Sequence, residues 1–394
     1  MDIPRIYLLP RRDERAQAGH PWIFSNEIDK AEEDIEAGAM ADVFSSREKF
    51  IGRGFCNPQS LIAVRLLTRR PEPVDEAFIR RKIQAALALR EEIFPGEGAY
   101  RLVFGESDGL PGIVIDRLGN VFVVQSYCLG ADKLLPHVFA ALKTLFSPCS
   151  ILKKSDSSLR ELEGLKEDVE VIEGELNPPI EITQGFHGNK LKFLTDPLGG
   201  QKTGFFFDQR ENRVRLTFYA KSKTVLDAYS YGGGFGLYAA FAGAKSVTCA
   251  DSSESACDLA KKNFEINGLE GEVLREDVET LFGRFRTEKR KFDIIILDPP
   301  AFAKSKKNVF SAIRKYGSLN QAAMACLPPG GILFSCSCSH HVGRKEFIKM
   351  IAEAAWALGR TAKVLEMRGQ GRDHPLLASM PETEYLKCAI VRVD

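Results

Sequence analysis

The stretch that decides the fold reads Val225-Leu226-Asp227-Ala228-Tyr229-Ser230-Tyr231-Gly232-Gly233-Gly234-Phe235-Gly236. Residues 225–228 predict a buried strand, and residues 237–242 continue as a helix. The glycines between them let the backbone take positive φ values and approach a ligand closely. The helix that follows offers free N–H groups and a positive dipole end. Because ligands of doubly wound sheets bind where strands open into such loops, this turn predicts a cofactor cradle.

Strands and helices alternate from about Thr224 onward. After the first strand we expect a strand at 246–250 and a helix at 255–267. Further strands are expected at 273–275, 292–297 and 332–335. This rhythm implies a parallel sheet with right-handed crossovers. The predicted C-terminal domain is therefore α/β, with a Rossmann-like, doubly wound sheet.

The residues before this region predict a different organisation. Short strands at 41–44, 50–54 and 61–67 indicate a small β-rich barrel or half-barrel. A helix at 75–94 and strands at 101–104, 112–115 and 121–125 indicate a compact α+β region. At 394 residues the chain is long enough for two or three domains. We expect domains at 1–72, 73–178 and 179–394, with an entry β-hairpin near 180–194.

Composition excludes several classes of protein. None of the nine Cys residues forms a CxxC pair, so we expect no metal site. An odd number of scattered thiols is typical of a reducing cytoplasm. No apolar run is long enough to span a bilayer, and residues 1–10 lack an export pattern. We therefore expect a cytoplasmic protein without a membrane partner.

Charge is distributed unevenly, although the net charge is only +1. No Asp or Glu occurs between Pro299 and Lys345. The basic residues of this stretch are Lys304, Lys306, Lys307, Arg314, Lys315, Arg344 and Lys345. It is either a local anion-binding surface or an ordinary solvated face.

Carboxylates follow several of the predicted strands. Asp251 could accept hydrogen bonds from both hydroxyls of a ribose, and Asp277 could accept one from an adenine amino group. Residues 234–239 match G-x-G-x-x-A, a nicotinamide dinucleotide pattern. However, Asp227 would repel a pyrophosphate and could bind the amino group of a methionine. The carboxylates therefore favour S-adenosylmethionine over a dinucleotide.

The fourth strand ends in Asp298-Pro299-Pro300-Ala301-Phe302. Such a D-P-P-x-F turn is common in methyltransferases that act on planar nitrogenous substrates. Its prolines and aromatic ring would form a rigid ledge for a base, with the carboxylate at the edge. The alternative is an ordinary strand-ending turn.

Longer motifs carry a family resemblance along nearly the whole chain. They are Gly19-His20-Pro21-Trp22-Ile23-Phe24, Glu106-Ser107-Asp108-Gly109-Leu110-Pro111-Gly112 and Thr203-Gly204-Phe205-Phe206-Phe207-Asp208-Gln209-Arg210-Glu211-Asn212-Arg213. With them, the sequence resembles the ribosomal large-subunit RNA methyltransferase I family, which makes 5-methylcytidine in 23S rRNA. The resemblance implies an RNA-binding PUA domain, a middle α+β domain and a class I methyltransferase domain. It also implies that residues 208–210 close over the cofactor.

Together, the motifs and the resemblance predict a set of binding residues. Cofactor binding is expected of Asp208, Gln209, Arg210, Asp227, Tyr229, Tyr231, Gly232, Gly233, Asp251, Ser252, Asp277, Asp298 and Pro299. Substrate binding is expected of Pro300, Phe302, Lys304, Lys306 and Lys307. The expected partner is 23S rRNA, with its target base unpaired or flipped out. A homodimer is left open.

The resemblance also implies a nucleophile. Carbon 5 of cytosine reacts poorly unless a thiolate first adds to carbon 6, which is covalent catalysis. The family motif F-S-C-S occurs here as Phe334-Ser335-Cys336-Ser337, so Cys336 is the expected nucleophile and Asp298 its catalytic partner. Alone, Cys336 would be interpreted as a core residue. Cys338, His340 and His341 receive no role.

Three other functions are compatible with parts of the pattern. Methylation of an RNA nitrogen would suit the D-P-P-x-F turn and would need no Cys. An RNA-binding protein with a degenerate catalytic domain would keep the basic stretch. A nicotinamide-dependent oxidoreductase would use the glycines of residues 234–239.

Overall fold

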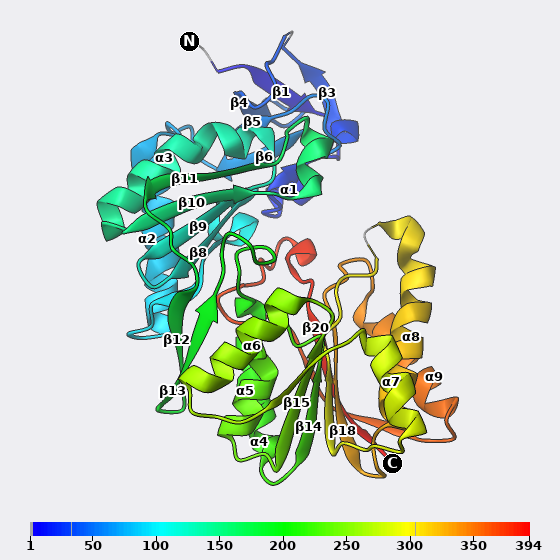
Figure 1. Ribbon diagram of the computed structural model, residues 1–394. Coiled ribbons are helices and arrows are strands. Elements are labelled where there is room, and N and C mark those ends of the chain that lie inside the picture. Colours follow the sequence, from blue (N-terminus) through cyan, green and yellow to red (C-terminus); the bar gives the residue numbers. More distant parts are fainter. Residues whose placement is uncertain (1–2, 33, 304) are drawn as a thin grey trace. The chain divides into compact units, whose positions relative to one another are not determined.

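The computed structural model describes residues 3–32, 34–303 and 305–394, and the chain divides into two compact units (Figure 1). Unit one comprises Met1–Ile182, Asp196–Phe205 and Asp373–Thr383. Unit two comprises Thr183–Thr195, Phe206–Arg372 and Glu384–Asp394. The separate boundary expected near residue 72 stays a prediction.

The first sheet of unit one has six strands in the order β2-β6-β5-β4-β1-β3. Its side chains alternate between the core and the surface, as in β4, because successive residues of a strand point to opposite faces. Ile6, Val43 and Val64 are among the fully buried residues. The strands are β1 (Arg5–Leu8), β2 (Trp22–Ile23), β3 (Ile28–Ala31), β4 (Met40–Phe44), β5 (Phe50–Cys56) and β6 (Val64–Thr68), with a short helix α1 (Glu14–Gln17).

The second sheet of unit one has five strands in the order β11-β10-β9-β8-β7. Helix α2 (Glu76–Ile93) begins after Asp75, whose side chain accepts from Phe78 N at 2.9 Å and so caps the helix. Helix α3 (Leu129–Phe146) shares a hydrophobic core with α2 and the sheet. The strands are β7 (Ala99–Phe104), β8 (Ile113–Leu118), β9 (Val121–Ser126), β10 (Ser150–Ser155) and β11 (Asp168–Gly174).

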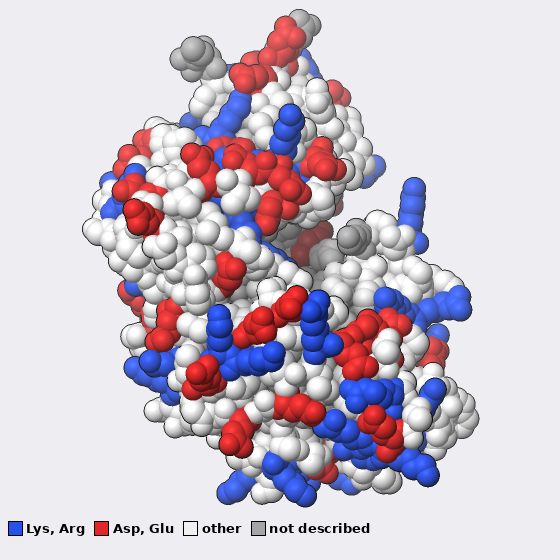
Figure 2. Space-filling view, viewed as in Figure 1, with Lys and Arg blue, Asp and Glu red and all other residues white. Residues whose placement is uncertain are grey.

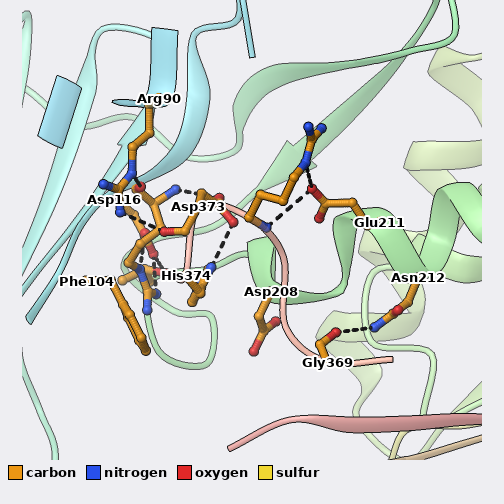
Figure 3. A network of polar contacts seen from close by, with 12 residues as sticks. Arg90, Phe104, Asp116, Asp208, Glu211, Asn212, Gly369, Asp373 and His374 are labelled. Carbon is orange, nitrogen blue, oxygen red and sulfur yellow. Dashed lines mark hydrogen bonds and ion pairs between the residues drawn. The ribbon is translucent and has the colours of Figure 1, made fainter. Parts of the chain in front are cut away.

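A segment near the C-terminus belongs to unit one. Buried Asp373 accepts from the backbone N of Arg101 at 3.0 Å, and its carbonyl accepts from Arg90 Nη2 at 2.8 Å (Figure 3). Nδ1 of His374 lies 2.8 Å from the Asp373 carboxylate, and its ring packs against Phe104. These buried polar contacts fix residues 373–383 on unit one.

Unit two is built on a seven-stranded sheet in the order β16-β15-β14-β17-β18-β20-β19. Figure 1 shows α4, α5 and α6 on one face of the sheet and α7, α8 and α9 on the other. The strands are β14 (Thr224–Ala228), β15 (Ser246–Asp251), β16 (Glu272–Arg275), β17 (Ile294–Leu297), β18 (Gly331–Ser337), β19 (Ala362–Arg368) and β20 (Lys387–Val393). The helices are α4 (Arg210–Ala220), α5 (Gly234–Phe241), α6 (Glu254–Ile266), α7 (Val278–Thr287), α8 (Val309–Ala325) and α9 (Arg344–Trp356).

The predicted doubly wound α/β fold is confirmed, but the sheet is not wholly parallel. β20 runs antiparallel to both of its neighbours, β18 and β19. The strand–helix alternation ends at α9, and no α-helix separates β19 from β20. A parallel neighbour would need such a crossover, so the last strand returns in the opposite direction. Two further strands, β12 (Ile180–Phe186) and β13 (Asn189–Thr195), form a separate hairpin.

Within the described ranges, no helix combines the length and apolar character needed to cross a membrane.

Candidate active site

The turn after β14 has an unusual backbone. Tyr229 has a φ of +62°, Tyr231 of +47° and Gly233 of +77°. Positive φ is rare for residues other than glycine, and its cost is tolerated mainly at functional sites. Helix α5 then begins at Gly234. The turn therefore keeps an unfavourable conformation at the carboxyl end of the central strand, where the sequence predicts the cofactor.

Asp227, the fourth residue of β14, is 1% exposed. Its Oδ2 accepts from the backbone N of Gly236 at 2.8 Å and so ties the strand to α5. Its Oδ1 is buried without a hydrogen-bond partner among the described residues, as is Oγ of Ser230. Burial raises the pKa of Asp227 to about 7. An ammonium donor at this place would satisfy Oδ1 and restore the charged carboxylate, so the cradle fits the methionine end of S-adenosylmethionine.

The second carboxylate, Asp251, joins two loops at the end of β15. Its Oδ2 accepts from Tyr231 N at 3.0 Å, and its Oδ1 accepts from Ser253 N at 2.9 Å. Each carboxylate oxygen has a second lone pair, which leaves room for ribose hydroxyls. Ser252 is exposed between them.

Asp277 has a structural task that sequence patterns did not predict. Its Oδ1 accepts from Thr280 N at 3.0 Å and caps α7. The carboxylate is exposed at the end of the loop that follows β16. Only its second oxygen remains for the expected contact with an adenine amino group.

The loop after β17 carries the expected substrate ledge. Asp298 is half-buried, Pro299 is buried and Pro300 is exposed. The ring centroids of Phe302 and Tyr316 lie 4.7 Å apart. Lys315 Nζ lies 4.7 Å from the centroid of the Phe302 ring. Phe302 therefore packs on the core as well as bordering the site. Lys307 is exposed, whereas Lys304 and the side chain of Lys306 lie outside the described residues.

Cys336 lies on β18, next to β17, and is 1% exposed. It stands directly opposite Cys388 of the antiparallel strand β20. A hydrogen bond with Cys388, burial and the Asp298 carboxylate together raise the pKa of the Cys336 thiol. The structure thus brings Cys336 and Asp298 within electrostatic reach of each other. Cys338 is partly exposed farther along the chain.

The short helix before α4 and the first residue of α4 contribute three expected residues, Asp208, Gln209 and Arg210, all buried. Asp208 Oδ2 accepts from the Tyr385 hydroxyl at 2.6 Å. With its amide oxygen facing Arg210, Gln184 accepts from Nε at 3.0 Å and from Nη2 at 3.2 Å. Gln209 Oε1 accepts from Asn212 Nδ2 at 2.7 Å. Arg210 is thus held by the hairpin strand β12, a contact that sequence reasoning missed.

Sequence reasoning also missed the buried Arg213. Its guanidinium lies so close to Gly234 that a Cβ there would be 2.7 Å from Nε. Three carboxylates interact with it electrostatically: Asp208, Asp298 and Asp227. A fixed cation among these groups stabilises their charged forms. The only feature of the sequence that pointed to Arg213 was its place in the motif of residues 203–213.

Gly236 tests how tightly the cradle is packed. A Cβ at this position would lie 2.3 Å from Cys249 Sγ and 3.2 Å from Val247 Cγ1. We expect Gly236→Ala to destabilise the protein by about 1–3 kcal/mol because the buried neighbours must move. Thermal unfolding measures this change. Gly283→Ala on α7, where a Cβ meets nothing within 4 Å, should instead stabilise by about 0.5–1 kcal/mol. Equal melting temperatures for the two variants would contradict the expectation.

Comparison with solved structures defines the class. A crystal structure described as that of a methyltransferase in complex with SAH superposes on this chain with a TM-score of 0.83. The two chains are 22% identical, and the match covers 100% of both. A second structure, described as a SAM-dependent methyltransferase from Streptococcus mutans, superposes with a TM-score of 0.82 at 21% identity. The match covers 99% of this chain and 100% of that chain. With the sheet order of unit two, these likenesses establish the fold of a class I methyltransferase.

Sequence comparison adds the particular family. A PUA-like domain model matches residues 6–69, and a model described as conserved hypothetical protein 95 matches residues 206–329. Ribosomal RNA large subunit methyltransferase I of Klebsiella pneumoniae is 40% identical over 99% of this chain and 98% of its own. Its namesake from Aliivibrio fischeri is 41% identical over 98% and 99%. The chain belongs to the ribosomal RNA large subunit methyltransferase I family, which confirms the predicted resemblance.

Proposed function

We propose that this protein methylates carbon 5 of a cytosine in 23S rRNA, with S-adenosylmethionine as donor and Cys336 as nucleophile. The observation that carries the proposal is the nearness of Cys336 on β18 to Asp298, the residue that follows the neighbouring strand β17. Both lie at the carboxyl ends of strands, where ligands of doubly wound sheets bind.

The cradle would hold the donor through its carboxylates. Asp227 Oδ1 would accept from the methionine ammonium, and Asp251 would accept from the ribose hydroxyls. The second oxygen of the Asp277 carboxylate would accept a hydrogen bond from the adenine amino group. The bound donor would be bordered by residues 208–210, by the turn at Tyr229, Tyr231, Gly232 and Gly233, and by Ser252 and Pro299. When bound, S-adenosylmethionine supplies the methyl group that carbon 5 takes up.

The protein's own residues would provide the rest of the reaction. The Cys336 thiolate forms a bond to carbon 6 of cytosine, which makes carbon 5 an enamine carbon able to accept the methyl group. The Asp298 carboxylate hydrogen-bonds the edge of the base and orients it. Loss of the proton from carbon 5 then lets the sulfur–carbon 6 bond break and regenerates the thiolate.

The surface of α8 would bind the RNA backbone. The exposed residues Phe310 and Arg314 are four positions apart and so share one side of α8, and the exposed Lys307 lies in the short 3-10 helix Lys306–Asn308 that precedes it. Phe310 is 74% exposed, and Arg314 lies over its ring. Figure 2 shows Lys and Arg side chains projecting over α8. Cations would bind phosphates here, while Pro300 and Phe302 border the base. Since its cysteines are all free thiols, we propose that the protein acts in the cytoplasm.

Release of tritium from carbon 5 of cytosine would identify the atom that is methylated. Large-subunit rRNA from cells that lack this gene would be labelled with tritium on carbon 5 of cytosine. We expect the protein to release one tritium into water for each methyl group transferred, because substitution at carbon 5 expels that hydrogen. Methyl transfer with the tritium retained would contradict the proposal and indicate methylation of a nitrogen. Mass spectrometry of the digested RNA would identify the product.

A further inference from the structure

The Cys336 thiol faces an electrostatic problem that the proposed reaction must overcome. Burial, the Cys388 thiol and the Asp298 carboxylate all disfavour the thiolate. Yet the thiolate, and not the thiol, is the nucleophile. A donor aimed at the sulfur would stabilise the negative charge before it adds to a base.

Gln209 provides such a donor. It lies in the short helix Phe207–Gln209, and its side chain is 2% exposed. Its Oε1 accepts from Asn212 Nδ2 at 2.7 Å. Its Nε2 is buried and makes no hydrogen bond to any of the described residues. This unpaired donor lies close enough to the Cys336 thiol for the Gln209 amide to lower the pKa of that thiol.

The orientation of this amide is fixed from a distance. Arg368 Nε on β19 can only donate, and it donates to Asn212 Oδ1 at 3.0 Å. Asn212 must therefore turn its Nδ2 the other way, where it donates to Gln209 Oε1 at 2.7 Å. The same Nδ2 donates to the carbonyl of Gly369 at 3.1 Å (Figure 3). Gln209 in turn must present its Nε2 on the side of Cys336. A permanent cation thus sets the direction of the whole chain of amides.

We propose that Gln209 is a positioning residue that stabilises the Cys336 thiolate through its amide N–H, with Asn212 and Arg368 holding that amide in place. This role rests on the proposed function of Cys336, and it goes beyond the expected contact of Gln209 with the cofactor. Arg368 and Asn212 act only through Gln209 and do not touch the reacting atoms.

Gln209→Met tests the role because it keeps the length of the side chain and removes the donor. Single-turnover methyl transfer would be followed over a pH series, with S-adenosylmethionine saturating at each pH. We expect the acidic limb of the profile to move to higher pH, with a loss of roughly 10- to 100-fold near neutral pH. The rate should approach that of the wild type at high pH, where the thiol ionises without help.

Asn212→Asp tests the same chain without changing any atom next to the sulfur. The new carboxylate would still accept from Arg368 but would attract Gln209 Nε2, so the amide should turn its donor away from Cys336. We expect a shift in the same direction, together with a lower melting temperature because the carboxylate cannot donate to the Gly369 carbonyl. Gln125→Met is the matched control, since Gln125 is a buried glutamine of unit one that donates to the Lys154 carbonyl. It should leave the profile in place.

The outcomes separate this inference from the proposed function. A shifted limb in both Gln209→Met and Asn212→Asp supports the role. An unchanged profile, or an equal loss at every pH, would overturn it, because a purely structural residue would not move the limb. If Cys336→Ala is inactive while Gln209→Met keeps the normal profile, only the role of Gln209 fails. If Cys336→Ala is fully active, the proposed function itself fails.

Discussion

Cys336→Ala should abolish methyl transfer while leaving the cofactor site intact. If the thiolate forms the bond that activates the base, its loss should lower the single-turnover rate by on the order of 10³-fold or more. The side chain is small and lies on β18 rather than in the turn after β14, so calorimetry should give a nearly unchanged affinity for S-adenosylmethionine. The pairing of these two results is what a nucleophile predicts.

The control is a second buried cysteine of the same unit. Cys326 at the end of α8 is 1% exposed, as is Cys336, but it interacts electrostatically with Lys291 and Arg286 rather than with the catalytic groups. Cys326→Ala should reproduce any loss of stability without loss of rate. Full activity in Cys336→Ala would instead favour methylation of a nitrogen, which needs no covalent adduct.

The cradle was predictable because its signals are local. A short apolar run, a glycine-rich turn and a helical segment follow one another within residues 225–242, and each has a physical cause that a single sequence reveals. The carboxylates at the ends of β14, β15 and β17 were predictable for the same reason. The choice of S-adenosylmethionine over a dinucleotide rests on Asp227, Asp251, Asp277 and the Asp298 turn together.

Features that depend on distant pairing were not predictable. Cys388 lies opposite Cys336 only because β20 turns back between β18 and β19. Nothing in the local pattern of either strand specifies that register. Similarly, residues 373–383 belong to unit one because Asp373 meets Arg90 and Arg101, which precede it by more than 250 positions.

The dual use of side chains was also hidden from the sequence. Asp277 was expected to bind a cofactor, yet its first oxygen caps α7. The motif of residues 203–213 predicts cofactor contacts for Gln209, and the buried amide next to Cys336 gives this side chain the further role that we propose. Residue types give the available chemistry, but hydrogen-bond partners decide how each group uses it.

Binding of S-adenosylmethionine should weaken as the pH falls below about 7. The free protein buries Asp227, which raises its pKa to about 7, so that below this pH the carboxyl is mostly protonated. An ammonium requires the carboxylate, so binding there must expel a proton. The affinity should fall about tenfold for each pH unit below the pKa and become level above it. Calorimetry in two buffers of different ionisation enthalpy should detect the released proton only on the acidic side.

The stability of the free protein should change with the opposite sign. Because the folded pKa of Asp227 is raised from 3.8 to about 7, its protonation stabilises the fold. This contribution is complete below the unfolded pKa of 3.8 and is lost as the pH rises through about 7. A shift of about three units corresponds to roughly 4 kcal/mol at most. The free protein should therefore lose stability between these pH values, and the cofactor should restore it on the alkaline side.

Asp227→Asn separates the two effects in one variant. The amide can still accept from Gly236 N, but it carries no charge, so the free protein should melt at a higher temperature than the wild type on the alkaline side. Its affinity for S-adenosylmethionine should fall by roughly 30- to 1000-fold and lose its pH dependence, since a buried ammonium loses its partner. Asp293→Asn is the matched control, because that carboxylate bonds Thr224 at the opposite end of β14. If Asp227→Asn binds the cofactor as the wild type does, Asp227 serves only to tie the turn to α5.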